Sequence, residues 1–178
     1  MRSLTSITLL LMLIPGLLIG QTLQADLESS SMQIKGTSSL HDWESEVQSF
    51  DISGMQEGNL IRDLEGNLEV KSIKSGKSIM DDKTYNALGA DKFPDIKFQA
   101  KQLEINNGII SGTISVTIKD QTKEFEISTA STLSSGNINV SGEVPLDMME
   151  FGIDPPTAMF GTLTTGKDVK IAFQITLK

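Results

Sequence analysis

Few residues in this chain could carry out catalysis. His41 is the single histidine, it stands beside Asp42, and the chain contains no cysteine. One histidine cannot build the multi-histidine sites typical of catalytic zinc or non-haem iron, and no nucleophilic serine motif accompanies it. Two interpretations of His41 stay open: a polar ligand contact or acid–base group that acts with Asp42, and a hydrogen-bonded residue that holds the loop before the next strand.

Two further motifs are better explained by structure than by chemistry. Segment 161–168 resembles a phosphate-binding loop, but Asp168 occupies the position of the hydroxyl that binds magnesium, and the segment leads into a strand instead of opening a helix. Asp81 and Asp82 are adjacent carboxylates that could bind a metal, yet carboxylates also favour the first turn of a helix. We therefore expect no catalytic residue, no metal and no cofactor.

The N-terminal segment has the composition of a signal peptide. Arg2 precedes an uncharged apolar run over residues 7–19, which is short for a membrane span. We predict that residues 1–25 are a signal peptide and that residues 26–178 form one domain; a retained membrane anchor is the alternative. The expected location is the periplasm of a bacterium, or the medium after secretion.

The net charge of −8 describes an acidic chain whose Lys and Arg residues are scattered singly. Removal of Arg2 with the signal peptide makes the charge more negative still. The absence of a basic stripe argues against nucleic acid as a partner, and repulsion from anionic lipid argues against stable membrane insertion. Because cysteine is absent, stability must come from a core without disulfides.

An alternation of apolar and polar residues with a period of two dominates the chain from Ser30 onward. In the last segment Val169, Ile171 and Phe173 alternate with residues on a wetter face, which is typical of a strand buried on one side. Turn residues separate further segments with this pattern. We predict eight strands, near residues 31–36, 43–54, 62–73, 95–105, 110–118, 125–129, 138–144 and 169–177.

In two of these strands the apolar phase slips by one residue. Within 43–54 Val47 gives way to Phe50, and within 95–105 Ala100 gives way to Leu103. A slip of one residue turns every later side chain to the other face of the sheet. We therefore expect a β-bulge inside each strand.

A short helical pattern interrupts the strands at residues 78–89. Met80, Ala87 and Leu88 share one face of the helix, and Gly89 can adopt the left-handed conformation that ends it. Two to three turns are not stable alone in water, so the apolar face must pack on the strands.

The predicted fold class is all-β, with one short helix between strands three and four. Eight antiparallel strands can close into a barrel or pack as a two-sheet sandwich. We favour the barrel, because a helix can cover one of its mouths, whereas a sandwich has no place for the helix. Met80, Leu88 and Phe93 are expected to border this mouth, with Tyr85 at its edge.

The inward phases of the strands are almost wholly aliphatic and aromatic. Small residues such as Gly66, Gly112 and Gly142 interrupt them, which indicates either bends of the wall or space for a ligand. Because no charge points inward, a ligand must be apolar for most of its length. The residues that we predict to line the barrel and its mouth are Trp43, Leu68, Val70, Met80, Leu88, Phe98, Ile114, Val116, Phe125, Ile127, Ile138, Val140, Ile171 and Phe173.

Five segments, taken in order, resemble the YceI-like family of exported lipid-binding proteins. They are 38–43, with Ser-Ser-Leu-His-Asp-Trp; 72–81; 85–98, with Lys-Phe-Pro-Asp-Ile-Lys-Phe; 112–125; and 151–156, with Phe-Gly-Ile-Asp-Pro-Pro. The resemblance implies a lipocalin-like, eight-stranded antiparallel barrel in the periplasm, whose apolar interior holds a long-chain lipid, typically a polyisoprenoid.

From this resemblance and the inward phases we expect an exported, non-enzymatic protein that transports, stores or sequesters a polyisoprenoid. One alternative is a ligand-free structural or protein-interaction barrel. Another is an enzyme that modifies isoprenoids, for which only His41 and Asp42 are available. The sequence leaves open whether the protein is a monomer or a homodimer.

Overall fold

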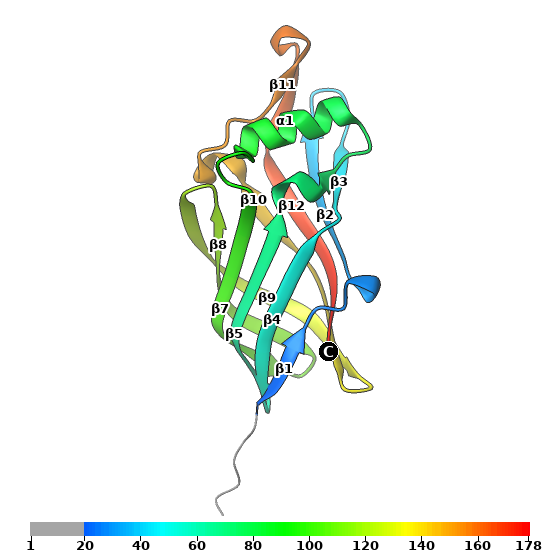
Figure 1. Ribbon diagram of the computed structural model, residues 1–178, viewed down its shortest axis with the longest axis vertical. Coiled ribbons are helices and arrows are strands. Elements are labelled where there is room, and N and C mark those ends of the chain that lie inside the picture. The colour runs from blue at the N-terminus through cyan, green and yellow to red at the C-terminus, as the bar shows by residue number, and fades with distance from the viewer. Residues whose placement is uncertain (1–19) are drawn as a thin grey trace, which may run out of the picture.

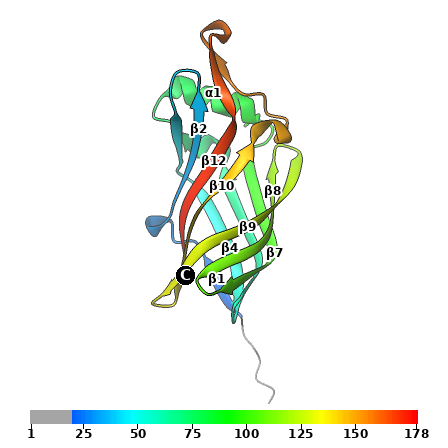
Figure 2. The same cartoon turned by 180° about the vertical axis from the view of Figure 1, so that it is seen from behind.

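One antiparallel sheet forms most of the protein in the computed structural model, which describes residues 20–178 apart from the side chains of Ala158 and Met159. Figures 1 and 2 show the sheet from opposite sides. The strands of this described part are β1 (Gln21–Gln24), β2 (Ser31–Ser38), β3 (Trp43–Val47), β4 (Phe50–Glu57), β5 (Leu60–Glu69), β6 (Ile73–Lys74), β7 (Asp95–Asn106), β8 (Ile109–Ile118), β9 (Gln121–Ser134), β10 (Asn137–Asp147), β11 (Thr157–Ala158) and β12 (Leu163–Leu177). Its helices are α1 (Ser78–Leu88) and the short 3-10 helices η1 (Leu27–Ser29), η2 (Val70–Ser72), η3 (Met148–Phe151) and η4 (Met159–Gly161).

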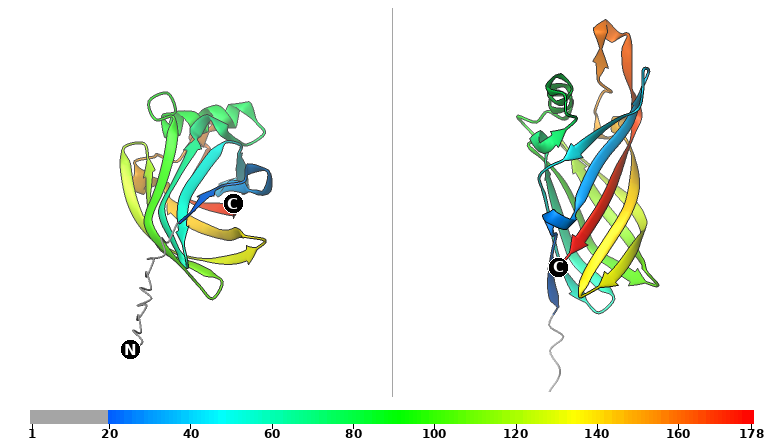
Figure 3. Two further views of the ribbon diagram at one scale, coloured as in Figure 1. Left: turned by 60° about the horizontal axis from the view of Figure 1, so that its bottom comes forward. Right: turned by 90° about the vertical axis from the view of Figure 1, so that its right-hand side faces the viewer.

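The sheet curls on itself, as Figure 3 shows, and apolar side chains pack in its interior. Its strands follow the order β1-β4-β5-β7-β8-β9-β10-β12-β2-β3-β6, and β11 pairs with β12 outside this path. We call the end that carries α1 the upper end, and the end with β1 and the C-terminus the lower end (Figure 1).

The prediction of a closed barrel of eight strands is wrong in strand number and in closure. Residues 43–54 form two strands, and β3 pairs with β2 only over 33–36 and 43–46. At the lower end an additional strand, β1, pairs with β4, and Ala25 bridges to Leu177 of β12. The result is a curled sheet instead of a ring of eight full-length strands.

Other predicted strands are correct in place but differ in length. The strand predicted at 62–73 ends at Glu69, where η2 turns the chain toward the short strand β6. The strand predicted at 125–129 is the middle of the longer β9. Alternation alone does not reveal these ends, because polar and small residues near the turns still pair in the ladder.

The bulge predicted within 95–105 is confirmed. The pairing of β7 with β8 shifts register between Gln99 and Glu104. Gly112 lies across from the shift with φ +148, and a Cβ added there would lie 2.9 Å from Leu103 Cδ2, so this position requires glycine. The slip predicted within 43–54 is instead a break in the strand, because β3 ends at Val47 and β4 begins at Phe50.

The helix prediction is confirmed, including its end. α1 spans Ser78–Leu88, and Gly89 follows it with φ 64. The Gly89 N–H donates to the Asn86 carbonyl and the Ala90 N–H to the Tyr85 carbonyl. These two bonds form a Schellman motif, which satisfies carbonyls at the end of the helix.

The strand β1 bears on where the folded domain begins, because it belongs to the sheet. Residues 1–19 of the predicted signal peptide lie outside the described residues, whereas Gln21–Gln24 pair with β4. The Leu23 side chain is 0% exposed. A boundary after Ala25 would remove this strand from the folded domain. Within the described residues, no helix combines the length and apolar composition needed to cross a membrane.

Candidate functional site

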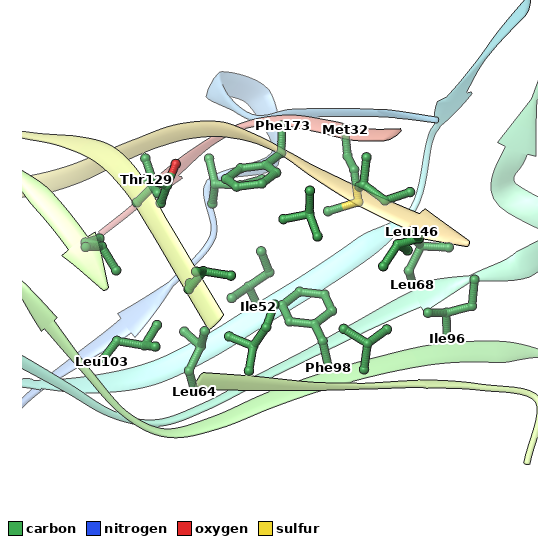
Figure 4. Close-up of a pocket in the computed structure, with 18 of the residues that line it drawn as sticks. Met32, Ile52, Leu64, Leu68, Ile96, Phe98, Leu103, Thr129, Leu146 and Phe173 are labelled. Carbon is green, nitrogen blue, oxygen red and sulfur yellow. The ribbon is translucent and has the colours of Figure 1, made fainter. Parts of the chain in front are cut away.

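An apolar cavity of about 180 Å³ lies inside the curled sheet (Figure 4). Phe98 of β7 and Phe173 of β12 face it from different strands of the wall. Among the described residues, Thr129 is the one that lines it with a polar side chain, and none that lines it is charged. The lining consists of Met32, Ile34, Ile52, Ile61, Leu64, Leu68, Ile96, Phe98, Leu103, Ile110, Ile114, Val116, Ile118, Ile127, Thr129, Val140, Val144, Leu146, Ile171, Phe173, Ile175 and Leu177.

The cavity is long in comparison with its volume. Along β8 its lining runs from Ile110 to Ile118, a length of about 26 Å at the usual rise of a strand. Its volume is close to the roughly 150 Å³ of an engineered protein cavity that accepts benzene. The interior is therefore a narrow apolar channel, and a bulky occupant must push side chains of the wall aside.

Part of the predicted lining faces this cavity. These residues are Leu68, Phe98, Ile114, Val116, Ile127, Val140, Ile171 and Phe173. Trp43, Val70, Met80, Leu88, Phe125 and Ile138 do not line it. Whether any of these side chains contacts a lipid stays a prediction.

The residues that do not line the cavity differ in where they lie. Trp43 and Phe125 pack in an apolar cluster at the upper end. Val70 and Ile138 are 1% and 0% exposed, so they are packed inside the protein. Met80 is an exposed residue of α1. Alternation indicates the face of a strand but not the height of a residue along the channel, which is why these positions were assigned to the lining.

The upper cluster covers the end of the channel below α1. Leu88 of α1 packs against it together with Ala87. Phe151 of η3 is 1% exposed, and its ring stacks on Phe125 with the centroids 6.3 Å apart. Leu88 and Phe151 therefore lie together at this end of the channel. That Met80, Leu88 and Phe93 border the mouth stays a prediction.

The glycines of the inner face are explained by aromatic rings. Phe98 pairs across the ladder with Gly66, and a Cβ added to Gly66 would lie 2.0 Å from Phe98 Cζ. Phe173 pairs in the same way with Gly142, where an added Cβ would lie 3.2 Å from Phe173 Cζ. The space beside Gly66 is thus occupied by the Phe98 ring, an arrangement known to stabilise glycines in sheets. The space beside Gly142 is occupied first by the Thr129 hydroxyl and then by the Phe173 ring.

Polar groups hold α1 over the upper end from outside the channel. The Tyr85 hydroxyl lies 2.9 Å from the Lys71 carbonyl and 3.0 Å from the Ile73 carbonyl, and it accepts a hydrogen bond of 2.6 Å from Lys74 Nζ. The bond from Lys74 to Tyr85 raises the pKa of the Lys74 ammonium. Tyr85 therefore joins α1 to η2 and β6.

The Asp81 carboxylate ties the start of α1 to the preceding loop. Its Oδ1 accepts hydrogen bonds from the Ser75 N–H at 2.8 Å and from Ser75 Oγ at 2.6 Å. Desolvation raises the pKa of Asp81, but the two bonds from Ser75 outweigh it, so the pKa lies below its usual value. No group of three or more His, Asp or Glu side chains that could hold a metal occurs among the described residues.

His41 lies on the turn between β2 and β3, away from the cavity lining. Its Nδ1 is 2.6 Å from the Asp42 carbonyl, and its carbonyl accepts a hydrogen bond from Ser38 Oγ at 2.7 Å. These contacts favour the interpretation of His41 as a residue that holds the turn.

Several lining residues were missed by the sequence prediction, and their phase could have identified some of them. Ile175 and Leu177 continue the alternation of Ile171 and Phe173 on β12, and Val144 continues that of Val140 on β10. Leu103 lies where the bulge of β7 shifts the register, between Gln99 and Glu104. The inward face of β7 after the bulge therefore cannot be assigned from the alternation before it.

A family model for the YceI-like domain matches residues 22–177 of the chain. Among solved structures, BcnA of Burkholderia cenocepacia aligns with a TM-score of 0.73 and 14% identity over 85% of this chain and 98% of that chain. A polyisoprenoid binding domain from Saccharophagus degradans, implicated in plant cell wall breakdown, aligns with a TM-score of 0.67 and 7% identity over 88% and 97% of the two chains. The YceI protein of Campylobacter jejuni aligns with a TM-score of 0.53 and 16% identity over 65% and 71%. Because the sequence identities are this low, the structural alignments show a shared fold and nothing more specific. A search of curated proteins gave no match.

The contact between Gly66 and Phe98 gives a test of the channel. In Gly66→Ala the new Cβ displaces the Phe98 ring into the cavity, so an uncharged naphthalene dye should bind about tenfold more weakly, with stability lowered by about 1–3 kcal/mol. Dye titration and thermal unfolding measure both effects. Adding Phe98→Leu should relieve the clash and restore binding. Unchanged dye affinity in Gly66→Ala would show that the ring does not border the binding space.

Proposed function

The chain belongs to the YceI-like domain family, and on this basis we propose that it binds a long apolar lipid, a polyisoprenoid, inside the curled sheet. The observation that carries the proposal is the long channel with an apolar lining from Ile110 to Ile118 and beyond. The Saccharophagus degradans domain, described as polyisoprenoid binding, supports the choice of lipid through its shared fold.

Burial of hydrocarbon supplies the binding free energy in this proposal. Each methylene moved from water into the channel contributes about 0.8 kcal/mol before ordering costs. The lining offers no charged partner, so a carboxylate or phosphate inside the channel would lose its hydration without compensation. The buried part of the ligand is therefore uncharged, and a charged head group would stay outside.

Transport, storage or sequestration of this lipid requires no chemistry on it. The side chain that could act as an acid or base, His41, lies on a turn outside the channel lining. The hydroxyl of Thr129 lines the channel but donates to the Ser141 carbonyl at 2.5 Å. Both observations support a non-enzymatic binding protein.

We also propose that the protein is exported to the periplasm, or secreted, with a signal peptide that ends before Gln21. The uncharged apolar run at 7–19 supports export. The fully buried Leu23 supports a boundary upstream of β1, because its loss would remove about 1.5–3 kcal/mol of apolar burial.

Extraction of the purified protein tests the lipid proposal. Protein expressed from the full chain in a bacterial host and purified without detergent should release a polyisoprenoid that mass spectrometry detects. Ile114→Trp fills the channel, so this variant should emerge empty while its stability changes by less than about 1 kcal/mol.

Ile138→Trp serves as the matched control, because Ile138 is 0% exposed and does not line the cavity. It should destabilise the protein by about 1–3 kcal/mol or more through overpacking. An empty wild type that retains no added polyprenol, together with equal destabilisation by both substitutions, would favour the ligand-free barrel instead.

The contacts of Tyr85 predict that α1 acts as a lid. Tyr85→Phe removes the hydroxyl that joins α1 to η2 and β6, and each lost bond is worth about 0.5–1.5 kcal/mol. Exchange of a bound fluorescent polyprenol should become several times faster with unchanged final occupancy. Thr84→Ala is the control, because the Thr84 hydroxyl donates to the Met80 carbonyl within the helix and so does not join α1 to η2 or β6. Equal exchange rates in wild type and Tyr85→Phe would reduce α1 to a static plug.

The mass of the exported protein tests where the proposed signal peptide ends. If the signal peptide ends before Gln21, intact mass and N-terminal sequencing of the periplasmic protein will retain β1. A chain that begins at Asp26 and remains folded would contradict the proposal, since it would lack Leu23.

A further inference from the structure

Large apolar side chains are exposed around the upper end of the molecule. Leu40 is 67% exposed on the turn between β2 and β3, and Ile79 is 72% exposed at the start of α1. Phe160, in the turn between β11 and β12, is fully exposed. None of these side chains contributes to the core clusters, so the fold alone does not account for them.

The hairpin that carries Phe160 projects beyond α1, as Figures 1 and 3 show. Its sequence from Pro155 to Gly166 contains no charged residue, although the chain as a whole carries a net charge of −8. Phe160 itself has φ 54, a conformation unfavourable for a residue with a side chain. A strained, exposed aromatic residue in an uncharged segment indicates a surface used for contact.

Hydrogen bonds hold these segments together as one surface. The Ser39 N–H donates to the Thr164 carbonyl at 2.9 Å, and the Thr164 N–H donates to Ser39 Oγ at 3.2 Å, which joins the turn of Leu40 to the hairpin. Lys83 Nζ of α1 donates to the Thr157 carbonyl at 2.7 Å. We call Leu40, Ile79, Phe160 and the hairpin at 155–166 the apolar tip.

We propose that the apolar tip docks transiently on a neutral, zwitterionic lipid bilayer and that lipid enters and leaves the channel there. This inference rests on the proposed function, because a long apolar lipid is scarcely soluble in water and must be exchanged with a membrane. The hairpin at 155–166 carries no charged side chain of its own, so its insertion dehydrates none. The long Lys83 side chain, which bonds to the Thr157 carbonyl, can keep its ammonium group at the head-group level. The upper cluster, which closes the channel, lies at the same end of the molecule below α1.

The negative net charge of the chain favours docking on a neutral bilayer over docking on an anionic one. A protein with a net charge of −8 is repelled by anionic lipid head groups. A tip without charge still gains from burying Leu40 and Phe160 at the interface of a neutral bilayer. Docking is therefore reversible and weakens as anionic lipid is added.

Transfer from vesicles tests the proposal with the full exported protein. Phosphatidylcholine vesicles that carry a fluorescent polyprenol are mixed with the protein, and the rate of transfer and the final occupancy are measured. The double variant Phe160→Asp, Leu40→Asp should transfer lipid about tenfold more slowly and reach the same occupancy. Leu133→Asp is the matched control, because Leu133 is 63% exposed at the opposite end of the molecule, and it should behave as wild type.

The outcomes separate docking from ligand binding. Equal transfer rates in wild type and the double variant overturn docking through the tip and point to a partner protein as the user of this surface. Faster transfer after phosphatidylserine is added would overturn the selection of neutral bilayers. If the wild type binds no polyprenol at all, the proposed function fails, and sedimentation with empty phosphatidylcholine vesicles still tests docking: only the wild type and Leu133→Asp should sediment.

Discussion

The interior of this protein depends on aromatic rings that occupy the space beside glycines of the neighbouring strand. Phe98 covers Gly66, Phe173 covers Gly142, and a Cβ added to Gly36 would lie 2.3 Å from the ring of Trp43. Each pair is a direct cross-strand neighbour in the ladder. Because each ring fills the space beside a glycine, the inner face is covered by apolar surface while a cavity remains between the strands.

The wall of the channel and the helix above it are stabilised by different interactions. The wall is held by burial of aliphatic side chains, with Ile61, Ile110 and Ile138 almost or completely inaccessible toward the lower end. Above the apolar cluster of Phe151, α1 is held by polar contacts outside the channel, such as those of Tyr85, and it contains no buried residue. Such an element has little apolar burial to lose when it moves, so the two ends differ in their resistance to opening.

Much of this fold could be predicted from the sequence because a strand places alternate side chains on opposite faces. This rule identified most strands, the bulge of β7 and the inward direction of Phe98 and Ile114. It could not show that Phe125 meets Phe151 at the upper end, because that contact joins segments without a common period. The strand β1 was missed because its short segment adjoins the apolar N-terminal run, and Met80 was misplaced because a short helix can rotate on the surface that it covers.

The two ends of the described chain meet in one place. The Gln24 N–H donates to the Lys178 carbonyl and the Lys178 N–H donates to the Gln24 carbonyl, each at 2.9 Å, while β2 takes its place beside β12. A chain that is still being synthesised lacks these partners, so the seam between β2 and β12 can form only after β12 has been made. Completion of the fold must therefore be a late event that depends on contacts between residues far apart in sequence, and the edge of β2 that pairs with β12 stays unpaired until then.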